Sequence, residues 1–154
     1  MPKKVHPLAG MAAFLIILSF WVSTLVSELF AGYATIALVK SSILWGMLAL
    51  VPLLILTGVS GMKMGSRRRD ALALSKKKRM PFIALNGILI LVPSAFFLAA
   101  RAETGLFDVW FYSVQALELA AGAVNLILMG LNVRDGLRMT GRLGSLSNVR
   151  AVAE

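Results

Sequence analysis

The 154-residue sequence contains no cysteine and only one histidine. Without cysteine the chain cannot form disulfides or bind iron–sulfur clusters and other metals through thiolates. The single histidine, His6, excludes a metal centre built from several histidines of one chain. Phosphate-binding glycine loops and the HExxH zinc motif are also missing, and no nucleophile stands with a suitable base. These absences favour a protein without enzymatic activity.

Charge is scarce, and most of the chain is apolar. Charged residues make up 15% of the sequence and hydrophobic residues 58%, with a mean hydropathy of +0.82. A helix needs about 20 apolar residues to cross a bilayer. The sequence therefore predicts an all-α membrane protein: a four-helix bundle of two hairpins in a single domain, residues 1–154. The transmembrane helices are expected at about 8–29, 35–62, 80–100 and 108–133. The first of them is interpreted as a retained helix and not as a signal peptide.

The few basic residues are unevenly distributed. Fourteen of the sixteen lie before the first apolar segment, in a loop predicted at 63–79, or in a tail predicted at 134–154. Loops rich in Lys and Arg stay in the cytoplasm, so both termini are predicted to be cytoplasmic in a bacterial inner membrane. This distribution explains the net charge of +9 without a nucleic-acid partner.

The basic loop and tail are candidates for binding anionic lipid head groups. A purely topological role, or a cytoplasmic partner, is the alternative. Ala71 to Leu74 could form a helical turn at the membrane surface, and the arginines of the tail recur at helical spacing. The candidate head-group residues are Arg67, Arg68, Arg69, Lys76, Lys77, Lys78, Arg79, Arg134, Arg138 and Arg142.

One face of the fourth segment combines polar and small residues. Its members alternate at spacings of three and four, which places them on one side of a helix. Lipid cannot satisfy polar side chains, so this face is predicted to point toward the other helices. The polar seam, as we call this set, comprises Gln115, Glu118, Gly122, Asn125, Met129 and Asn132.

Two charged residues, Lys40 and Glu118, fall inside apolar segments, and Glu28 lies at the end of another. A charge within a bilayer is costly and needs a partner or a purpose. Counted at about 1.5 Å per residue, Lys40 and Glu118 lie at similar depths from the same side, so a buried pair is predicted. The side chains expected around this pair are Gln115, Glu28, Ser23, Ser27 and Ser94.

The purpose of this cluster is open at the sequence level. The pair could simply fix helix register and pairing. Alternatively, two acids against one lysine leave a carboxyl group that can carry a proton, in a pocket open to the periplasm. In a third case these groups do not converge at all.

A second polar set is expected toward the cytoplasm and comprises Asn86, Asn125, Asn132 and His6. Asparagines commonly join membrane helices through hydrogen bonds, while His6 is expected to be interfacial and solvated. No cofactor is predicted. A haem b or a quinone in a groove remains an alternative, with Met11, Met62 or another subunit's His6 as a second axial ligand to the haem.

Four strings of the sequence resemble a family of small four-helix inner-membrane proteins of proteobacteria. They are His6-Pro-Leu-Ala-Gly-Met, Phe20-Trp-Val-Ser-Thr-Leu-Val-Ser-Glu-Leu, Lys78-Arg-Met-Pro-Phe-Ile-Ala-Leu-Asn-Gly and Leu131-Asn-Val-Arg-Asp-Gly-Leu-Arg. The resemblance covers nearly the whole chain and implies a fold and a location but no activity. A lysine before a glycine-bearing helix also resembles small haem-b membrane proteins, but the paired histidines of those proteins are missing.

Two functions fit these observations. The first is a non-enzymatic accessory or structural subunit that assembles with itself or with other membrane-protein subunits. The second is a small proton-coupled transporter or channel that uses Glu118 and Lys40. A charged path through the cytoplasmic half would favour the second function, and the sequence does not supply one.

Overall fold

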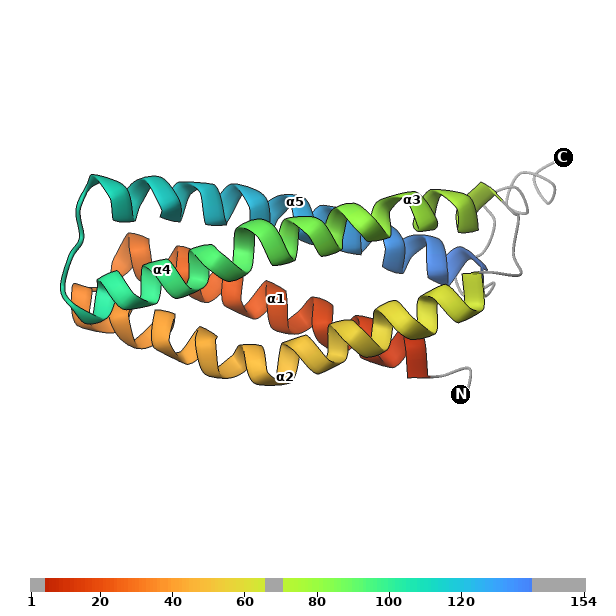
Figure 1. Ribbon diagram of the computed structural model, residues 1–154, viewed down its shortest axis with the longest axis horizontal. Coiled ribbons are helices and arrows are strands. Elements are labelled where there is room, and N and C mark those ends of the chain that lie inside the picture. Colours follow the sequence, from red (N-terminus) through yellow and green to blue (C-terminus); the bar gives the residue numbers. More distant parts are fainter. Residues whose placement is uncertain (1–4, 66–70, 140–154) are drawn as a thin grey trace, which may run out of the picture.

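The computed structural model describes residues 5–65 and 71–139, and within these ranges the chain is helical apart from two short turns (Figure 1). The elements are α1 (Val5–Phe30), α2 (Tyr33–Gly65), α3 (Ala71–Asn86), η1 (Gly87–Leu91), α4 (Val92–Glu103) and α5 (Val109–Met139). The segments α3, η1 and α4 follow one another without a break and together form the third span. The described part thus forms four long helical spans, each long and apolar enough to cross a membrane.

The four spans form a ring. Helix α1 packs against α2 and α5, and the third span packs against the same two helices from the other side. Helices α2 and α5 therefore lie diagonally opposite each other. Both short connections, 31–32 and 104–108, lie at one end of the bundle, which we call the turn end (left in Figure 1). The other end, where α2 finishes, α3 begins and α5 finishes, is called the basic end.

The helices are longer than expected at the basic end. The segment 63–79, predicted as a loop, is helical at 63–65 and again from Ala71, and α5 continues to Met139 through the start of the predicted tail. Alanine, leucine, lysine and arginine, which dominate residues 71–79, are strong helix formers. Hydropathy predicts where the apolar stretch ends, but the residues beyond that point still favour a helix, so the helices continue past it.

Prolines lie in the interior of two of the spans. Pro93 follows the π-helical segment η1, in which the Val92 N–H donates to the Gly87 carbonyl oxygen, five residues back. Proline lacks an N–H and crowds the carbonyl four residues before it, so a wider turn just upstream accommodates Pro93. Pro52 lies inside α2, which changes direction near its middle in Figure 1.

Glycines allow α1 to approach two neighbours closely. A Cβ atom at Gly46 of α2 would lie 2.4 Å from Phe20 Cζ, and one at Gly122 of α5 would lie 2.8 Å from Trp21 Cδ1. The Trp21 indole N–H also donates to the Leu119 carbonyl oxygen at 2.9 Å. Two consecutive aromatic residues of α1 therefore fit against glycines on its two neighbours, which is how small residues bring membrane helices together.

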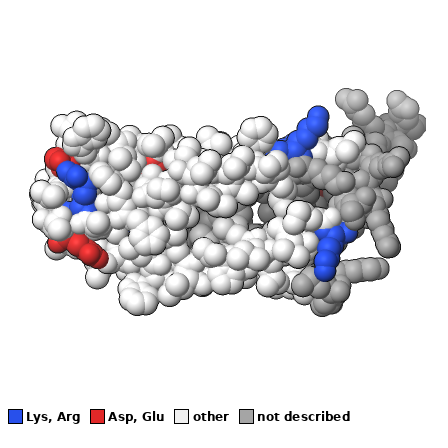
Figure 2. Space-filling view, in the orientation of Figure 1, with Lys and Arg blue, Asp and Glu red and all other residues white. Residues whose placement is uncertain are grey.

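The apolar side chains point both inward and outward. Inside, one cluster lies in the turn-end half around Ile36, Leu98 and Phe111, and another lies toward the basic end around Ala13 and Ile83. Outside, large apolar side chains are exposed along all four spans, among them Leu38, Trp45, Phe82, Phe96 and Ile127. Figure 2 shows that the middle of one face is almost free of charged residues, which gather at the two ends. Such a surface suits contact with lipid or with other apolar helices.

Candidate functional site

The polar seam of α5 faces the interior of the bundle. Gln115, Gly122, Asn125, Met129 and Asn132 are all buried, and Glu118 is mostly so. Lipid offers no hydrogen-bond partners. A helix with one polar face can therefore satisfy that face within a membrane only by turning it toward other helices. The seam therefore sets the rotation of α5 in the bundle and defines where polar chemistry can occur.

Lys40 and Glu118 form an ion pair inside the turn-end half. The Lys40 Nζ atom donates to Glu118 Oε2 at 2.7 Å, with 1% of the lysine side chain and 14% of the glutamate side chain exposed. In the described ranges, the backbones of α2 and α5 make no close approach to each other. The long lysine side chain therefore bridges the diagonal of the bundle, and the contact expected from the sequence is present.

Gln115 and Glu28 complete this turn-end cluster. The Gln115 side-chain amide donates to Glu118 Oε2 at 3.1 Å, so one carboxylate oxygen accepts hydrogen bonds from both Lys40 and Gln115. Glu28, half-buried in the last turn of α1, lies within electrostatic reach of both Lys40 and Glu118. Two oxygens of the cluster, Glu28 Oε1 and Gln115 Oε1, are buried without a hydrogen-bond donor in the described part of the protein.

The serines expected in this cluster do not join it. Ser23 is exposed on the outer side of α1, and the neighbouring Thr24 is buried in its place. Ser27 is buried, but its hydroxyl donates to the Thr24 carbonyl oxygen. A spacing of four residues advances about 40° past a full helical turn, so a row of serines drifts from the outside to the inside. Ser94 is buried on α4, yet it is not among the described hydrogen-bond partners of the ion pair.

The asparagines link the third span to α5. The Asn86 side-chain amide donates to the Ala121 carbonyl oxygen at 2.8 Å and to Asn125 Oδ1 at 2.9 Å. Asn125 in turn donates to the Ile83 carbonyl oxygen at 3.4 Å. Asn132 is buried, and its Oδ1 atom has no donor within the described residues.

The sequence predicts His6 to be interfacial, solvated and close to the asparagines, and the structure shows it in contact with α2. His6 is half-buried, and its Nδ1 atom lies 3.0 Å from Ser60 Oγ and 3.1 Å from the Thr57 carbonyl oxygen, both on α2. Gly61 leaves the space for this contact, since a Cβ atom there would lie 3.0 Å from His6 Cε1. His6 therefore joins α1 to α2.

One buried charged residue, Asp135, was not among the predicted site residues. Its side chain is 2% exposed and accepts from Arg79 at 2.7 Å and from Arg134 at 3.2 Å. Asp135 follows Asn132 by three residues and so continues the polar seam, but hydropathy placed the end of the segment before it. Extending the seam by one more turn would have identified it.

Two of the candidate head-group residues are thus engaged within the protein: Arg79 and Arg134 pair with Asp135. Lys78 and Arg138 are exposed at the basic end. Lys76 and Lys77 lie on α3, within a stretch where only the helix is described. The remaining candidates, Arg67, Arg68, Arg69 and Arg142, lie outside the described residues.

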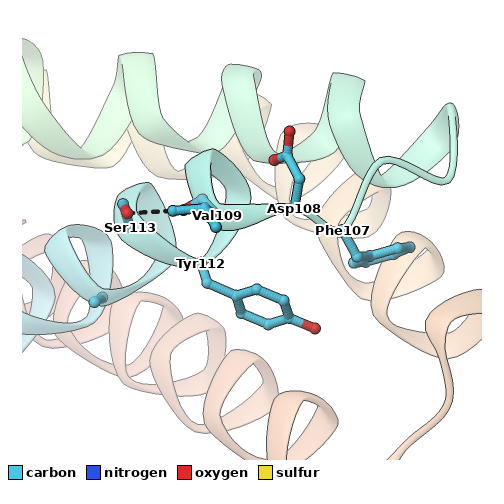
Figure 3. Close-up of a pocket in the computed structure, with 6 residues that line it drawn as sticks. Phe107, Asp108, Val109, Tyr112 and Ser113 are labelled. Carbon is cyan, nitrogen blue, oxygen red and sulfur yellow. Dashed lines mark hydrogen bonds between the residues drawn. The ribbon is translucent and has the colours of Figure 1, made fainter.

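A shallow depression opens at the turn end (Figure 3). Phe107, Asp108, Val109, Tyr112 and Ser113 line it, and the Ser113 hydroxyl donates to the Val109 carbonyl oxygen at 2.7 Å. The labelled side chains of Asp108 and Tyr112 point in different directions, so they do not converge on a ligand. Asp108 instead caps the start of α5: it accepts from the Phe111 N–H and pairs with Arg101. The Phe111 N–H, with help from Arg101, holds the pKa of Asp108 below its usual value.

Comparison with protein-family models, with curated proteins and with solved structures found no match. Within residues 5–65 and 71–139, no three His, Asp or Glu side chains are grouped so that they could hold a metal ion. The turn-end cluster, formed by Glu28, Lys40, Gln115 and Glu118, is therefore the candidate site on the basis of its own geometry.

Proposed function

We propose that this protein is an integral membrane protein of the bacterial inner membrane whose basic end faces the cytoplasm. Four helices of sufficient length and apolar character support the membrane location. The excess of Lys and Arg in residues 63–79 and after residue 133 supports the orientation.

The orientation can be tested with single cysteines, because the natural chain has none. Leu106→Cys places a thiol at the turn end, and Lys78→Cys places one at the basic end; both positions are exposed. In intact cells with a permeabilised outer membrane, an impermeant maleimide should label only the first variant. Opening the inner membrane should then expose the second. Labelling of Lys78→Cys in intact cells would contradict the orientation.

Within the membrane, the protein acts as a non-enzymatic accessory subunit that assembles with other membrane proteins. The observation that carries this proposal is the use made of buried polar groups. At three depths they connect one span to another: Lys40 to Glu118, Asn86 to Asn125, and Arg79 to Asp135. These links fix the bundle from inside and leave its exposed apolar faces available for lipid or a partner.

Site-directed photo-crosslinking in native membranes tests the accessory role. A photoreactive phenylalanine analogue at Trp45, which is exposed, should yield adducts with one or a few membrane proteins. The same analogue at Phe111, which is fully buried, is the matched control and should yield adducts within the chain only. Mass spectrometry identifies the partner, and an adduct of twice the chain mass indicates self-association. If scanning the outward positions of all four spans gives only lipid adducts, the accessory role is wrong.

A further inference from the structure

The turn-end cluster carries an unbalanced charge. Glu28 and Glu118 supply two negative charges and Lys40 supplies one positive charge. The ion pair between Lys40 and Glu118 satisfies one carboxylate and leaves the other, Glu28, without a counter-ion among the described residues of the cluster. An excess charge in surroundings of low dielectric is costly, so a compensating positive charge would be held strongly there.

Unpaired oxygens mark where that positive charge would bind. The side chain of Gln115 is nearly completely buried and directed at the ion pair by its bond to Glu118, yet its Oε1 atom has no donor in the described ranges. The same holds for the buried Oε1 atom of Glu28. The Gln115 Oε1 atom and the Oε1 atom of ionised Glu28 accept hydrogen bonds or cations and do not donate, and a buried acceptor left unsatisfied is unfavourable. The cluster therefore requires a donor or a cation.

We propose that the turn-end cluster binds one small monovalent cation, either a proton or an alkali cation, at the carboxyl group of Glu28. A proton forms an O–H bond to Glu28, and an alkali cation is coordinated by its oxygens; either makes the cluster neutral. Glu28 lies in the last turn of α1, so the cation exchanges with water at the turn end. This proposal depends on the membrane location proposed above but not on the accessory role.

Three titratable groups of the described residues interact electrostatically with Glu28. Helix α1 packs against α2 and α5, and Lys40, Glu118 and Tyr112 of these helices lie within electrostatic reach of Glu28. Lys40 already donates to Glu118, and its charge attracts the carboxylate of Glu28 in competition with a bound cation. Occupancy of the site is therefore coupled to the ion pair, and disrupting the pair should change it.

Infrared spectroscopy of the protein in phosphatidylcholine vesicles tests the proposal. In choline chloride, lowering the pH should produce the carbonyl band of a protonated carboxyl group that Glu28→Gln lacks. Glu103→Gln is the matched control, because Glu103 is an exposed glutamate at the same end and should leave that band unchanged. Gln115→Leu should weaken cation binding about tenfold, as expected for the loss of one hydrogen bond to a charged group.

Replacing choline by sodium or potassium identifies the cation. If the band persists at fixed pH, the site is specific for protons; if it decreases with alkali concentration and the carboxylate bands shift, the site binds that metal. Identical spectra of the natural protein and Glu28→Gln at every pH, and in each salt, would overturn the proposal. Amide-hydrogen exchange in the same samples reports on the membrane-embedded helices separately, so this failure would leave the membrane location standing.

A second measurement on the natural protein does not depend on the folding of any variant. An apolar carbodiimide reacts with protonated carboxyl groups, and peptide mass spectrometry locates the product. Glu28 should react more than Glu103 at the same pH, and the difference should diminish as cations or hydroxide displace the proton. Equal reaction at Glu28 and Glu103 under all conditions would contradict the proposal.

Discussion

Each end of the bundle contains one buried charge that is paired with charges of the opposite sign, and the sign of the buried charge differs between the two ends. At the turn end the cation, Lys40, is completely buried and faces two acids, Glu118 and Glu28. At the basic end the acid, Asp135, is completely buried and faces two cations, Arg79 and Arg134, which are partly exposed. The first cluster has one negative charge in excess and the second has one positive charge in excess.

Because of this difference, the buried ion pairs are expected to contribute differently to stability at the two ends. Arginine side chains are long and can keep part of the guanidinium group in water while it pairs with a buried acid. Lys40 has no such access to water, and among the described residues its ion-pair partner is Glu118. We therefore expect the turn-end pair to contribute more to stability, although the basic-end cluster has more hydrogen bonds.

The largest expected effect is that of removing Lys40. Lys40→Met leaves Glu118 buried and unpaired, and should lower the free energy of unfolding by about 3 kcal/mol, the lower end of the range for a stranded buried charge. Asp135→Asn should cost less, about 1–2 kcal/mol, because Arg79 and Arg134 can turn toward water. Unfolding in mixed micelles with increasing sodium dodecyl sulfate measures both. An equal or larger loss from Asp135→Asn would contradict the expectation that the turn-end pair contributes more to stability.

Substitution of a glycine should also cost more stability where the phenylalanine ring of a neighbouring helix lies closest to it. Gly46→Ala forces a methyl group to 2.4 Å from the rigid ring of Phe20, for an expected loss of about 2 kcal/mol. Gly61→Ala, nearer the basic end, meets His6 and the flexible Met80 at 3.0 Å and should cost less than about 1 kcal/mol.

Gly58→Ala is the matched control on the same helix, since no atom of the described residues lies within 4 Å of its added Cβ atom. It should be neutral or stabilise the helix by up to about 1 kcal/mol. The same unfolding assay applies to all three glycine variants. A Gly46→Ala variant as stable as Gly58→Ala would show that α1 and α2 are not packed as closely as described.

A neutral link in the basic half should matter less than either ion pair. Asn86→Ala removes the bonds to the Ala121 carbonyl oxygen and to Asn125. Hydrogen bonds between membrane helices contribute about 0.6 kcal/mol on average, so a loss of about 1 kcal/mol is expected. Asn86→Asp keeps the size but removes the donor and serves as a comparison. A loss above that of Lys40→Met would place the main polar link in the basic half.

The smallest effect concerns pH at the turn end. The pKa of Asp108 in the folded protein lies below its ordinary value of 3.8, chiefly because the Phe111 N–H donates to it. A lowered pKa contributes stability at pH values above 3.8, and this contribution disappears as the pH falls through the folded value. Asp108→Ala should therefore be slightly less stable than the natural protein at pH 6, and the difference should vanish in strong acid. A difference independent of pH would contradict this account.

The sequence was sufficient for the four helical spans and for the direction of the polar seam, because both follow from periodicity. The contact between Lys40 and Glu118 could also be predicted, since depth along a helix is fixed by its rise per residue. The positions of Ser23 and His6 could not, because they depend on the rotation of α1 by a fraction of a turn. Asp135 was missed because hydropathy ends a segment where charges begin, although a helix continues through them.

The most direct test of the account is a double-mutant cycle between Lys40 and Glu118. Lys40→Met and Glu118→Gln should each destabilise the bundle, and the double variant should recover at least about 1 kcal/mol of the summed loss, because it removes both members of the ion pair together and strands neither. Lys40→Met combined with Asp135→Asn is the control and should be additive, since the two residues lie in separate clusters. Additive losses for Lys40 and Glu118, within about 0.5 kcal/mol, would contradict an interior ion pair that joins α2 to α5.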